Sequence, residues 1–184
     1  WDYELAIVLK LLEADSRNFH GWQYRRWVVL MKEKAFVDSP STLLDSVASE
    51  FAYTTMQINK NILNFSAWHQ RLKLIPRLAE LIIDEPSSKH MAQLSQFSSP
   101  KAILAHELEL IKTGMYVDAD DSFVWLYLEW LLMDPFFREA DDEAMFRELP
   151  LEQLKIVDVL NELEIDDDPQ NRANTLCSKG LIFP

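Results

Sequence analysis

Apolar residues recur along the chain at steps of three, four and seven positions in three separate stretches. This spacing places them on one face of an α-helix, so each stretch predicts a helix that buries a single stripe. The three stripes are Leu5, Val8, Leu9 and Leu12; Leu44, Val47, Phe51 and Ile58; and Leu104, Leu108, Ile111 and Met115.

A second kind of helix follows each stripe, and a repeated motif marks its start. The three copies read RNFHGWQYRRW at 17–27, LNFSAWHQRLK at 63–73 and DDSFVWLYLEW at 120–130. Each copy has Asn or Asp four residues before a tryptophan: Asn18 before Trp22, Asn64 before Trp68, and Asp121 before Trp125. Because these side chains accept hydrogen bonds from the free N–H groups of a first turn, each motif predicts the beginning of a helix.

Short connectors join each stripe to its motif, which predicts antiparallel helical hairpins. Proline follows a capping-type residue at Ser39-Pro40, Ser99-Pro100 and Asp168-Pro169, and this pairing predicts three further helix starts. We expect hairpins at about 1–34, 41–84 and 100–134, a degenerate fourth hairpin at 150–182, and a loop insertion at about 85–99.

The second helices are apolar on nearly all sides, which predicts that they pack between neighbours on two sides. In the first of them the apolar residues are Phe19, Trp22, Tyr24, Trp27, Val28, Val29, Leu30 and Met31. One hairpin cannot bury such a helix, so we expect successive hairpins to stack around a shared core. The sequence therefore predicts an all-α solenoid that forms a single domain over 1–184.

Composition supports a helical globular chain and disfavours several functions. Of 184 residues, 48% are apolar and only three are glycine, fewer than strand-and-turn folds require. The formal net charge of −12 would repel nucleic acid. Cys177 is the single cysteine, which favours a reducing compartment such as the cytosol. We expect neither a membrane span nor a signal peptide, and the start at Trp1 suggests a trimmed front.

The motif residues are interpreted as structural. Trp22, Trp68 and Trp125 occupy identical repeat positions, as expected of packing anchors rather than a ligand platform. We expect Arg25, Arg26 and Arg71 to bridge to carboxylates or helix C-termini of the next hairpin, and not to bind phosphate or RNA.

The pattern of reactive side chains predicts no metal in this chain and no independent active site. The four histidines, at 20, 69, 90 and 106, do not stand at ligand spacing with one another or with Cys177. The chain has no Gly-x-Ser-x-Gly and no phosphate-binding glycine loop. The acidic runs at 139–144 and 164–169 are expected to be solvated connectors, and a basic partner could also use them.

Four stretches carry a resemblance to a known family: W-x-x-E-L at the start of the chain, RNFHGWQYRRWVV, NFSAWHQRLKLIP and HELELIKTGMYVDADDSFVWLYLEWLL. They resemble the repeats of the protein prenyltransferase alpha subunits, most of all the Rab (type II) geranylgeranyltransferase branch, from Trp1 to about Met133. The resemblance implies a right-handed α-α superhelix, a crescent of hairpins around a zinc-bearing beta subunit. It also implies geranylgeranyl diphosphate as co-substrate, Rab GTPases and a Rab escort protein as partners, and a cytoplasmic location.

The resemblance also implies a role for the first motif. Asn18, Phe19 and His20 match the region that, in the related farnesyl enzymes, approaches the diphosphate across the subunit interface. Phe19 stands where the farnesyl form has tyrosine and so lacks the hydroxyl, which leaves His20 as the candidate catalytic residue. The family's lysine-bearing repeat is expected N-terminal to Trp1, so the chain is expected to be a fragment that is inactive alone.

Two alternatives remain open at this point. A free-standing helical-repeat adaptor of tetratricopeptide type would bind peptides, but its period of about 34 residues is shorter than the observed tryptophan spacings of 46 and 57. An alpha subunit of a farnesyl or type I geranylgeranyl transferase would differ mainly in its partner, and Phe19 favours the Rab type over it.

Overall fold

The computed structural model of the chain describes residues 1–84, 94–118 and 121–138, and these residues form helices and connectors without a β-strand. The chain divides into two compact units, Trp1–Phe97 and Ser98–Pro184, which are described separately. The all-α fold class is therefore confirmed. The expected single domain over 1–184 stays a prediction, and the degenerate hairpin at 150–182 lies outside the described residues.

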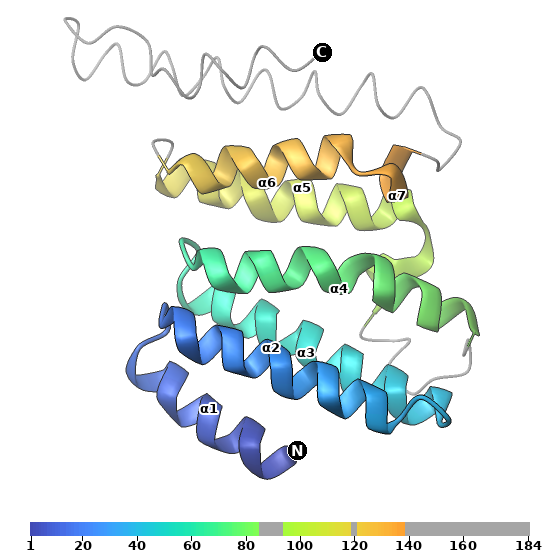
Figure 1. The fold of residues 1–184 in the computed structure, drawn as a ribbon. Helices are drawn as coiled ribbons and strands as arrows, with labels where there is room; N and C mark the ends of the chain where they lie inside the picture. Colours follow the sequence, from blue (N-terminus) through green and yellow to red (C-terminus); the bar gives the residue numbers. More distant parts are fainter. Residues whose placement is uncertain (85–93, 119–120, 139–184) are drawn as a thin grey trace, which may run out of the picture. The chain divides into compact units, whose positions relative to one another are not determined.

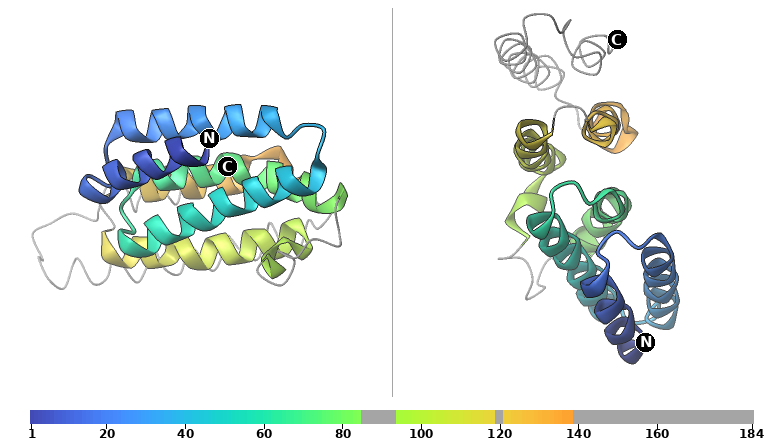
Figure 2. Two further views of the ribbon diagram at one scale, coloured as in Figure 1. Left: turned by 90° about the horizontal axis from the view of Figure 1, so that it is seen from below. Right: turned by 90° about the vertical axis from the view of Figure 1, so that its left-hand side faces the viewer.

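The first unit contains two helical hairpins (Figure 1). The first pairs α1 (Asp2–Ala14) with α2 (Phe19–Ala35), and the second pairs α3 (Pro40–Lys60) with α4 (Phe65–Asp84). The view along the helices in Figure 2 (right) shows α1 and α3 in one layer and α2 and α4 in the other. A short 3-10 helix, η1 (Ser95–Ser98), lies within the expected loop insertion and buries Phe97 against Phe51 at 5.1 Å between ring centroids.

The second unit has one hairpin, α5 (Pro100–Val117) with α6 (Ser122–Met133), followed by the short α7 (Pro135–Arg138). Its core contains Leu104, Leu108, Ile111 and Met115 of α5, each at most 2% exposed. Phe137 of α7 is also fully buried and meets Trp130 edge-on at 5.7 Å. The apolar stripe predicted for the first helix of the third hairpin is thus the face of α5 that lies in the core.

Among the described residues, the helix starts predicted at Asn, Asp or Ser follow the capping chemistry except at Ser39. Asn18, Ser99 and Asp121 each accept a hydrogen bond from a backbone N–H of the helix that follows. Ser39 stands at the N-cap position of α3, but its side chain caps no backbone group and pairs instead with the Thr42 hydroxyl at 2.8 Å. The predicted helix start at Ser39-Pro40 is therefore confirmed, although a nearby hydroxyl takes up the serine side chain.

The second helix of the first hairpin is not buried all round, contrary to the expectation. Trp22, Val28 and Val29 of α2 are buried, whereas Phe19, Tyr24, Trp27 and Leu30 are 42–62% exposed. The reason is geometric. Helices α1 and α3 cover the inner side of α2, and α4 lies beside it, so no described helix of the first unit covers the outer face of α2. An apolar outer face is consequently left on α2.

Candidate functional site

Two of the motif tryptophans form the same contact in their own hairpins. Trp22 and Trp68 are both 0% exposed, and each indole Nε1 donates to the carbonyl oxygen six residues earlier. The distances are 2.8 Å to Ser16 and 2.7 Å to Ile62. Each ring therefore fills the core and also fixes the connector that precedes its helix. In the second unit Trp125 is 6% exposed and follows Asp121, whose Oδ1 accepts from the Phe123 N–H at 2.9 Å.

The two motif asparagines of the first unit both cap a helix, but only Asn64 also forms a hydrogen bond to the other hairpin. Asn18 is half-buried, and its Oδ1 accepts from the Gly21 N–H at 2.8 Å. Asn64 is fully buried; its Oδ1 accepts from the Ala67 N–H at 3.3 Å, and its Nδ2 donates to the Ser16 carbonyl at 2.9 Å. Asn64 thus caps its own helix and also joins the second hairpin to the first.

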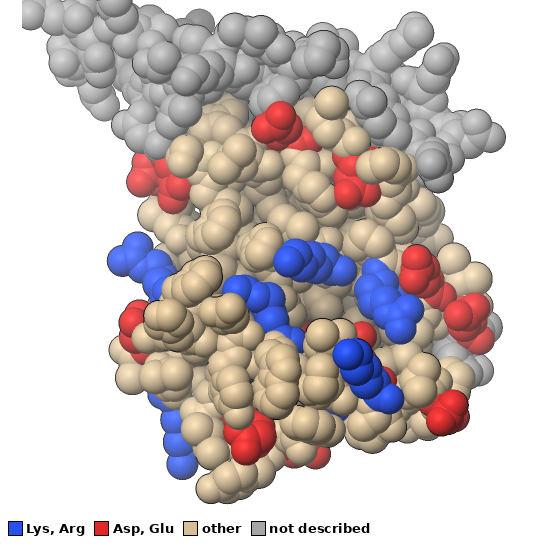
Figure 3. All heavy atoms as spheres, in the orientation of Figure 1, with Lys and Arg blue, Asp and Glu red and all other residues tan. Residues whose placement is uncertain are grey.

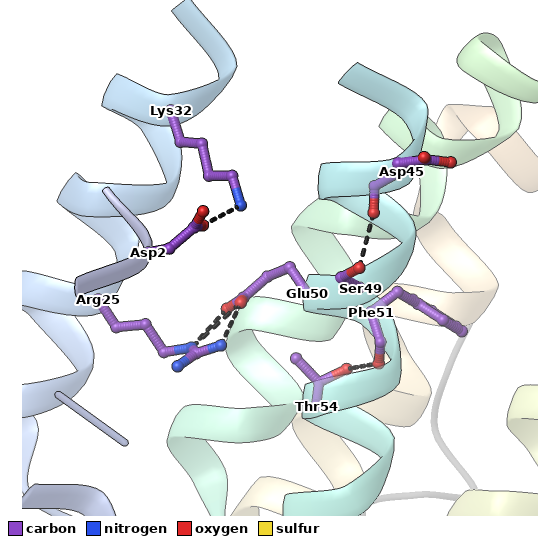
Figure 4. A network of polar contacts seen from close by, with 8 residues as sticks. All are labelled: Asp2, Arg25, Lys32, Asp45, Ser49, Glu50, Phe51 and Thr54. Carbon is purple, nitrogen blue, oxygen red and sulfur yellow. Dashed lines mark hydrogen bonds and ion pairs between the residues drawn. The ribbon is translucent and has the colours of Figure 1, made fainter. Parts of the chain in front are cut away.

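Arg25 lies between the hairpins and is neutralised there. Its guanidinium makes two-point contact with Glu50 of α3, with Nη2 2.6 Å and Nε 2.9 Å from the carboxylate oxygens (Figure 4). The guanidinium carbon also stands 3.4 Å from the centroid of the Tyr53 ring. Arg25 and Glu50 are 6% and 3% exposed, so the pair is a buried structural contact.

Arg71 holds the equivalent position in the second hairpin, three residues after Trp68. It is 0% exposed, donates from Nη1 to the Thr55 hydroxyl at 2.7 Å, and lies 4.0 Å from the centroid of the Phe51 ring. Its role is therefore also to fix packing in the core of the hairpin.

A set of three glutamates, which was not identified from the sequence, stands at a constant distance from the motif tryptophans. Glu4, Glu50 and Glu107 each stand eighteen residues before a motif tryptophan. Each accepts a hydrogen bond from the second helix of a hairpin: Tyr24 to Glu4 at 2.7 Å, Arg25 to Glu50, and Tyr127 to Glu107 at 2.8 Å. Their common spacing from the tryptophans was the signal that would have identified them.

His20 lies on the outer face of α2. It is exposed at the first turn, next to Phe19, whose ring meets the imidazole edge-on at 5.7 Å. Tyr24 and Trp27 follow at four- and seven-residue spacing on the same face, stacked at 5.6 Å, and Trp1 packs edge-on against Trp27 at 6.0 Å. The predicted catalytic histidine is thus accessible and begins an aromatic strip.

Arg26 belongs to a different environment from Arg25. It is partly exposed, its Nη1 atom is buried without a hydrogen-bond partner in the described residues, and burial lowers the pKa of its guanidinium. The positive charges of Lys73 and Arg26 act on His69 of α4. Burial first, and then the positive charges of Lys73 and Arg26, hold the pKa of His69 below its ordinary value. We call Arg26, His69 and Lys73 the basic cluster.

The residues with described positions show neither a metal-binding group of side chains nor a membrane-spanning helix. They contain no group of three His, Cys, Asp or Glu side chains close enough together to hold a metal ion. Among their helices, none has the length and apolar character needed to cross a bilayer.

Comparison with known proteins accounts for the repeat. The family described as protein prenyltransferase alpha subunit repeat matches residues 1–32 and 47–78, which contain the Trp22 and Trp68 motifs. The geranylgeranyl transferase type-2 subunit alpha of Candida albicans is 40% identical to the chain over 193 residues, covering 100% of this chain and 52% of the relative. The chain belongs to this prenyltransferase alpha subunit family. No solved structure matches it.

Further members of the prenyltransferase alpha family support the type-2 branch. The protein of the same name from Schizosaccharomyces pombe is 38% identical over 189 residues, covering 99% of this chain and 48% of the relative. The human protein of that name is 36% identical over 132 residues, covering 72% of this chain and 20% of its own length. The chain spans about half the length of the fungal relatives that it matches.

Proposed function

We propose that this chain is part of the alpha subunit of a type-2 geranylgeranyl transferase. In this proposal it binds a zinc-bearing beta subunit, and the heterodimer transfers geranylgeranyl groups to C-terminal cysteines of Rab GTPases presented by an escort protein. The observation that carries the proposal is the 40% identity to a type-2 alpha subunit over the whole chain. The proposed location is the cytoplasm.

The described structure supports a role for this chain at the edge of an active site in the beta subunit, rather than an active site of its own. The motif tryptophans, Asn64, Arg25 and Arg71 are all buried and serve the hairpin stack. The exposed outer face of α2 carries His20, Tyr24 and Trp27 instead. Exposed aromatic groups beside polar ones are typical of protein interfaces, so this face is the proposed contact surface for the beta subunit.

The zinc is assigned to the partner, where it would lower the pKa of the substrate thiol and favour the thiolate nucleophile. This chain would contribute positively charged and hydrogen-bonding side chains at the edge of the active site of the beta subunit. His20 is the proposed contributor on the diphosphate side, because its imidazole is exposed at the start of α2 and can donate a hydrogen bond to an anionic oxygen.

The test is coexpression of the full chain with the beta subunit of a fungal type-2 geranylgeranyl transferase. We expect a stoichiometric complex on gel filtration. Transfer of geranylgeranyl to a Rab–escort substrate would support the complete function, and a complex without turnover would fit a chain that supplies only part of the alpha subunit. Failure to bind any prenyltransferase beta subunit, together with binding of short peptides, would favour a repeat adaptor.

The role of His20 is tested in the heterodimer made with the full-length alpha subunit. His20→Ala is expected to lower isoprenoid transfer more than it lowers the affinity between the subunits. Gln23→Ala is the matched control, because Gln23 is another exposed polar residue of the same helix. Equal losses in transfer and in affinity for His20→Ala would assign His20 to the interface alone.

A further inference from the structure

The outer side of α4 carries a row of residues at four-residue steps, Phe65, His69, Lys73 and Arg77, which places them on one helical face. Phe65 and His69 stack with their rings 5.9 Å apart and nearly parallel, at an interplanar angle of 3°. Lys73 is exposed and His69 is half-buried. Arg26 belongs to α2, which contacts α4 (Figure 2), and its positive charge acts on His69 together with that of Lys73.

The basic cluster is not neutralised within the described residues. Arg77, one step further along α4, has carboxylates nearby, with Glu80 at 3.5 Å and Glu33 at 3.9 Å. Neither Arg26 nor Lys73 forms an ion pair with any described residue. The buried Nη1 of Arg26 also lacks a hydrogen-bond partner there.

A partly buried cationic group without a partner destabilises the folded chain, because it has lost hydrogen bonds to water and has formed none to the protein in their place. Elsewhere in this unit the arginines of the motif are supplied with partners: Arg25 has Glu50, and Arg71 has Thr55. The contrast indicates that the partner of Arg26 comes from outside the described residues of this unit.

The cluster also departs from the overall charge of the protein. The chain has 30 acidic residues against 18 lysines and arginines. Even so, Figure 3 shows several Lys and Arg side chains gathered on the face where α2 and α4 lie. A local positive area on an acidic protein selects a complementary anionic surface and raises the rate of encounter with it.

We propose that the basic cluster of Arg26, His69 and Lys73 is the docking site for carboxylate groups of an acidic segment of the beta subunit. Arg26 would use its free Nη1 in a charge-assisted hydrogen bond, and the exposed Lys73 would supply a second positive charge. The inference rests on the proposed function and adds to it the chemistry by which the partner is recognised.

The surroundings favour a protein segment over a free diphosphate. The cluster is flanked by exposed aromatic groups on the same two helices, namely Phe65 at 52% and Trp27 at 47% exposure. A diphosphate would pair with the cations and leave these rings in water. A protein segment would cover the rings and present carboxylates at the same time, which is the composition typical of interface centres and their rims.

The experiment measures the affinity of the full chain for the beta subunit of a fungal type-2 enzyme at low and at high salt. Lys73→Glu is expected to weaken binding on the order of tenfold or more and to reduce the salt dependence. Arg26→Gln and Lys73→Gln are expected to weaken it less. Lys10→Glu is the matched control, because Lys10 is an exposed lysine of α1 and the change in charge is identical. Circular dichroism melting of each variant checks the fold.

The outcomes separate this inference from the function on which it rests. If the unaltered chain binds no prenyltransferase beta subunit, both are overturned. If it binds, but Lys73→Glu and Lys10→Glu change the affinity equally, the docking site is wrong and the proposed function stands. A rise in KM for geranylgeranyl diphosphate with unchanged subunit affinity would assign the cluster to the diphosphate and also overturn the inference. Loss confined to the cluster variants supports it.

Discussion

Trp22 and Asn64 donate hydrogen bonds to the same carbonyl oxygen, that of Ser16, at 2.8 and 2.9 Å. Trp22 belongs to the hairpin that contains Ser16, whereas Asn64 opens the second helix of the next hairpin. A carbonyl oxygen has two lone pairs, and here the two bonds use both. The repeated motif therefore closes one connector and ties the neighbouring hairpin to it.

The hydrogen bond from Asn64 to Ser16 predicts that two chemically identical substitutions lower the free energy of unfolding by different amounts. Asn64→Ala removes a helix cap and the bond to Ser16, so we expect a loss of about 2 kcal/mol in the free energy of unfolding. Asn18→Ala, the matched control, removes the cap and an exposed contact with Asp15, and should cost about 1 kcal/mol. Urea unfolding of the full chain measures both. Equal costs would show that the bond between hairpins adds nothing to stability.

The tryptophans of the first hairpin also predict a contrast. Trp22 is 0% exposed and Trp27 is 47% exposed, although both are in α2. Trp22→Ala should cost on the order of 3–5 kcal/mol, because it leaves a cavity and removes the bond to Ser16. Trp27→Ala should cost less than about 1 kcal/mol, as expected for a partly exposed side chain. Thermal melting distinguishes the two; a similar shift for both variants would mean that α2 is covered on its outer side.

The sequence predicted where the described helices lie, because two independent patterns agree. The apolar stripes fix which faces of α3 and α5 are buried, and the spacing from Asn or Asp to Trp fixes where α2, α4 and α6 begin. What it missed depends on contacts between segments far apart in the chain. The exposure of Tyr24 and Trp27 follows from which neighbours are present, and an apolar pattern alone does not identify the absent neighbour.

The candidate site shows the same limit. His20 was found through a family resemblance, and its exposure agrees with an accessible role, but its chemistry stays a prediction. The difference between Arg25 and Arg26 could not be read from the sequence, since adjacent residues on a helix point about 100° apart and meet different helices. The Nη2 of Arg25 lies 2.6 Å from the carboxylate of Glu50, whereas the buried Nη1 of Arg26 has no described partner.

The Arg25–Glu50 pair predicts an asymmetry between single and double substitutions. Glu50→Ala leaves the buried guanidinium uncompensated and should cost about 3–5 kcal/mol. The double variant Arg25→Met with Glu50→Leu should cost clearly less than the two single losses together, because neither charge then remains buried alone. The measurement is a double-mutant cycle in urea. The exposed pair Lys32–Asp2 is the control, with a coupling of at most about 1 kcal/mol. Additive losses at Arg25 and Glu50 would contradict the buried pairing.

His69 predicts a pH dependence that reports on the basic cluster. Burial, then the charge of Lys73 and then that of Arg26, hold the pKa of His69 below its ordinary value of 6.5. Because the folded-state pKa is lowered, His69 contributes stability that is fully present above pH 6.5 and is lost as the pH falls through the folded pKa. Lys73→Gln removes one repelling charge, so the pKa of His69 should rise towards its ordinary value and the loss of stability in acid should become smaller.

Proton NMR of the His69 ring measures this pKa directly, and melting temperatures between about pH 5 and pH 8 measure its effect on stability. Lys10→Gln removes an equal charge from α1 and should leave the pKa of His69 unchanged. If carboxylates of a partner dock on the cluster, the same pKa should also rise when the beta subunit binds, since an opposite charge stabilises the protonated imidazole. An unchanged value in Lys73→Gln would show that Lys73 lies too far from His69 to belong to one cluster with it.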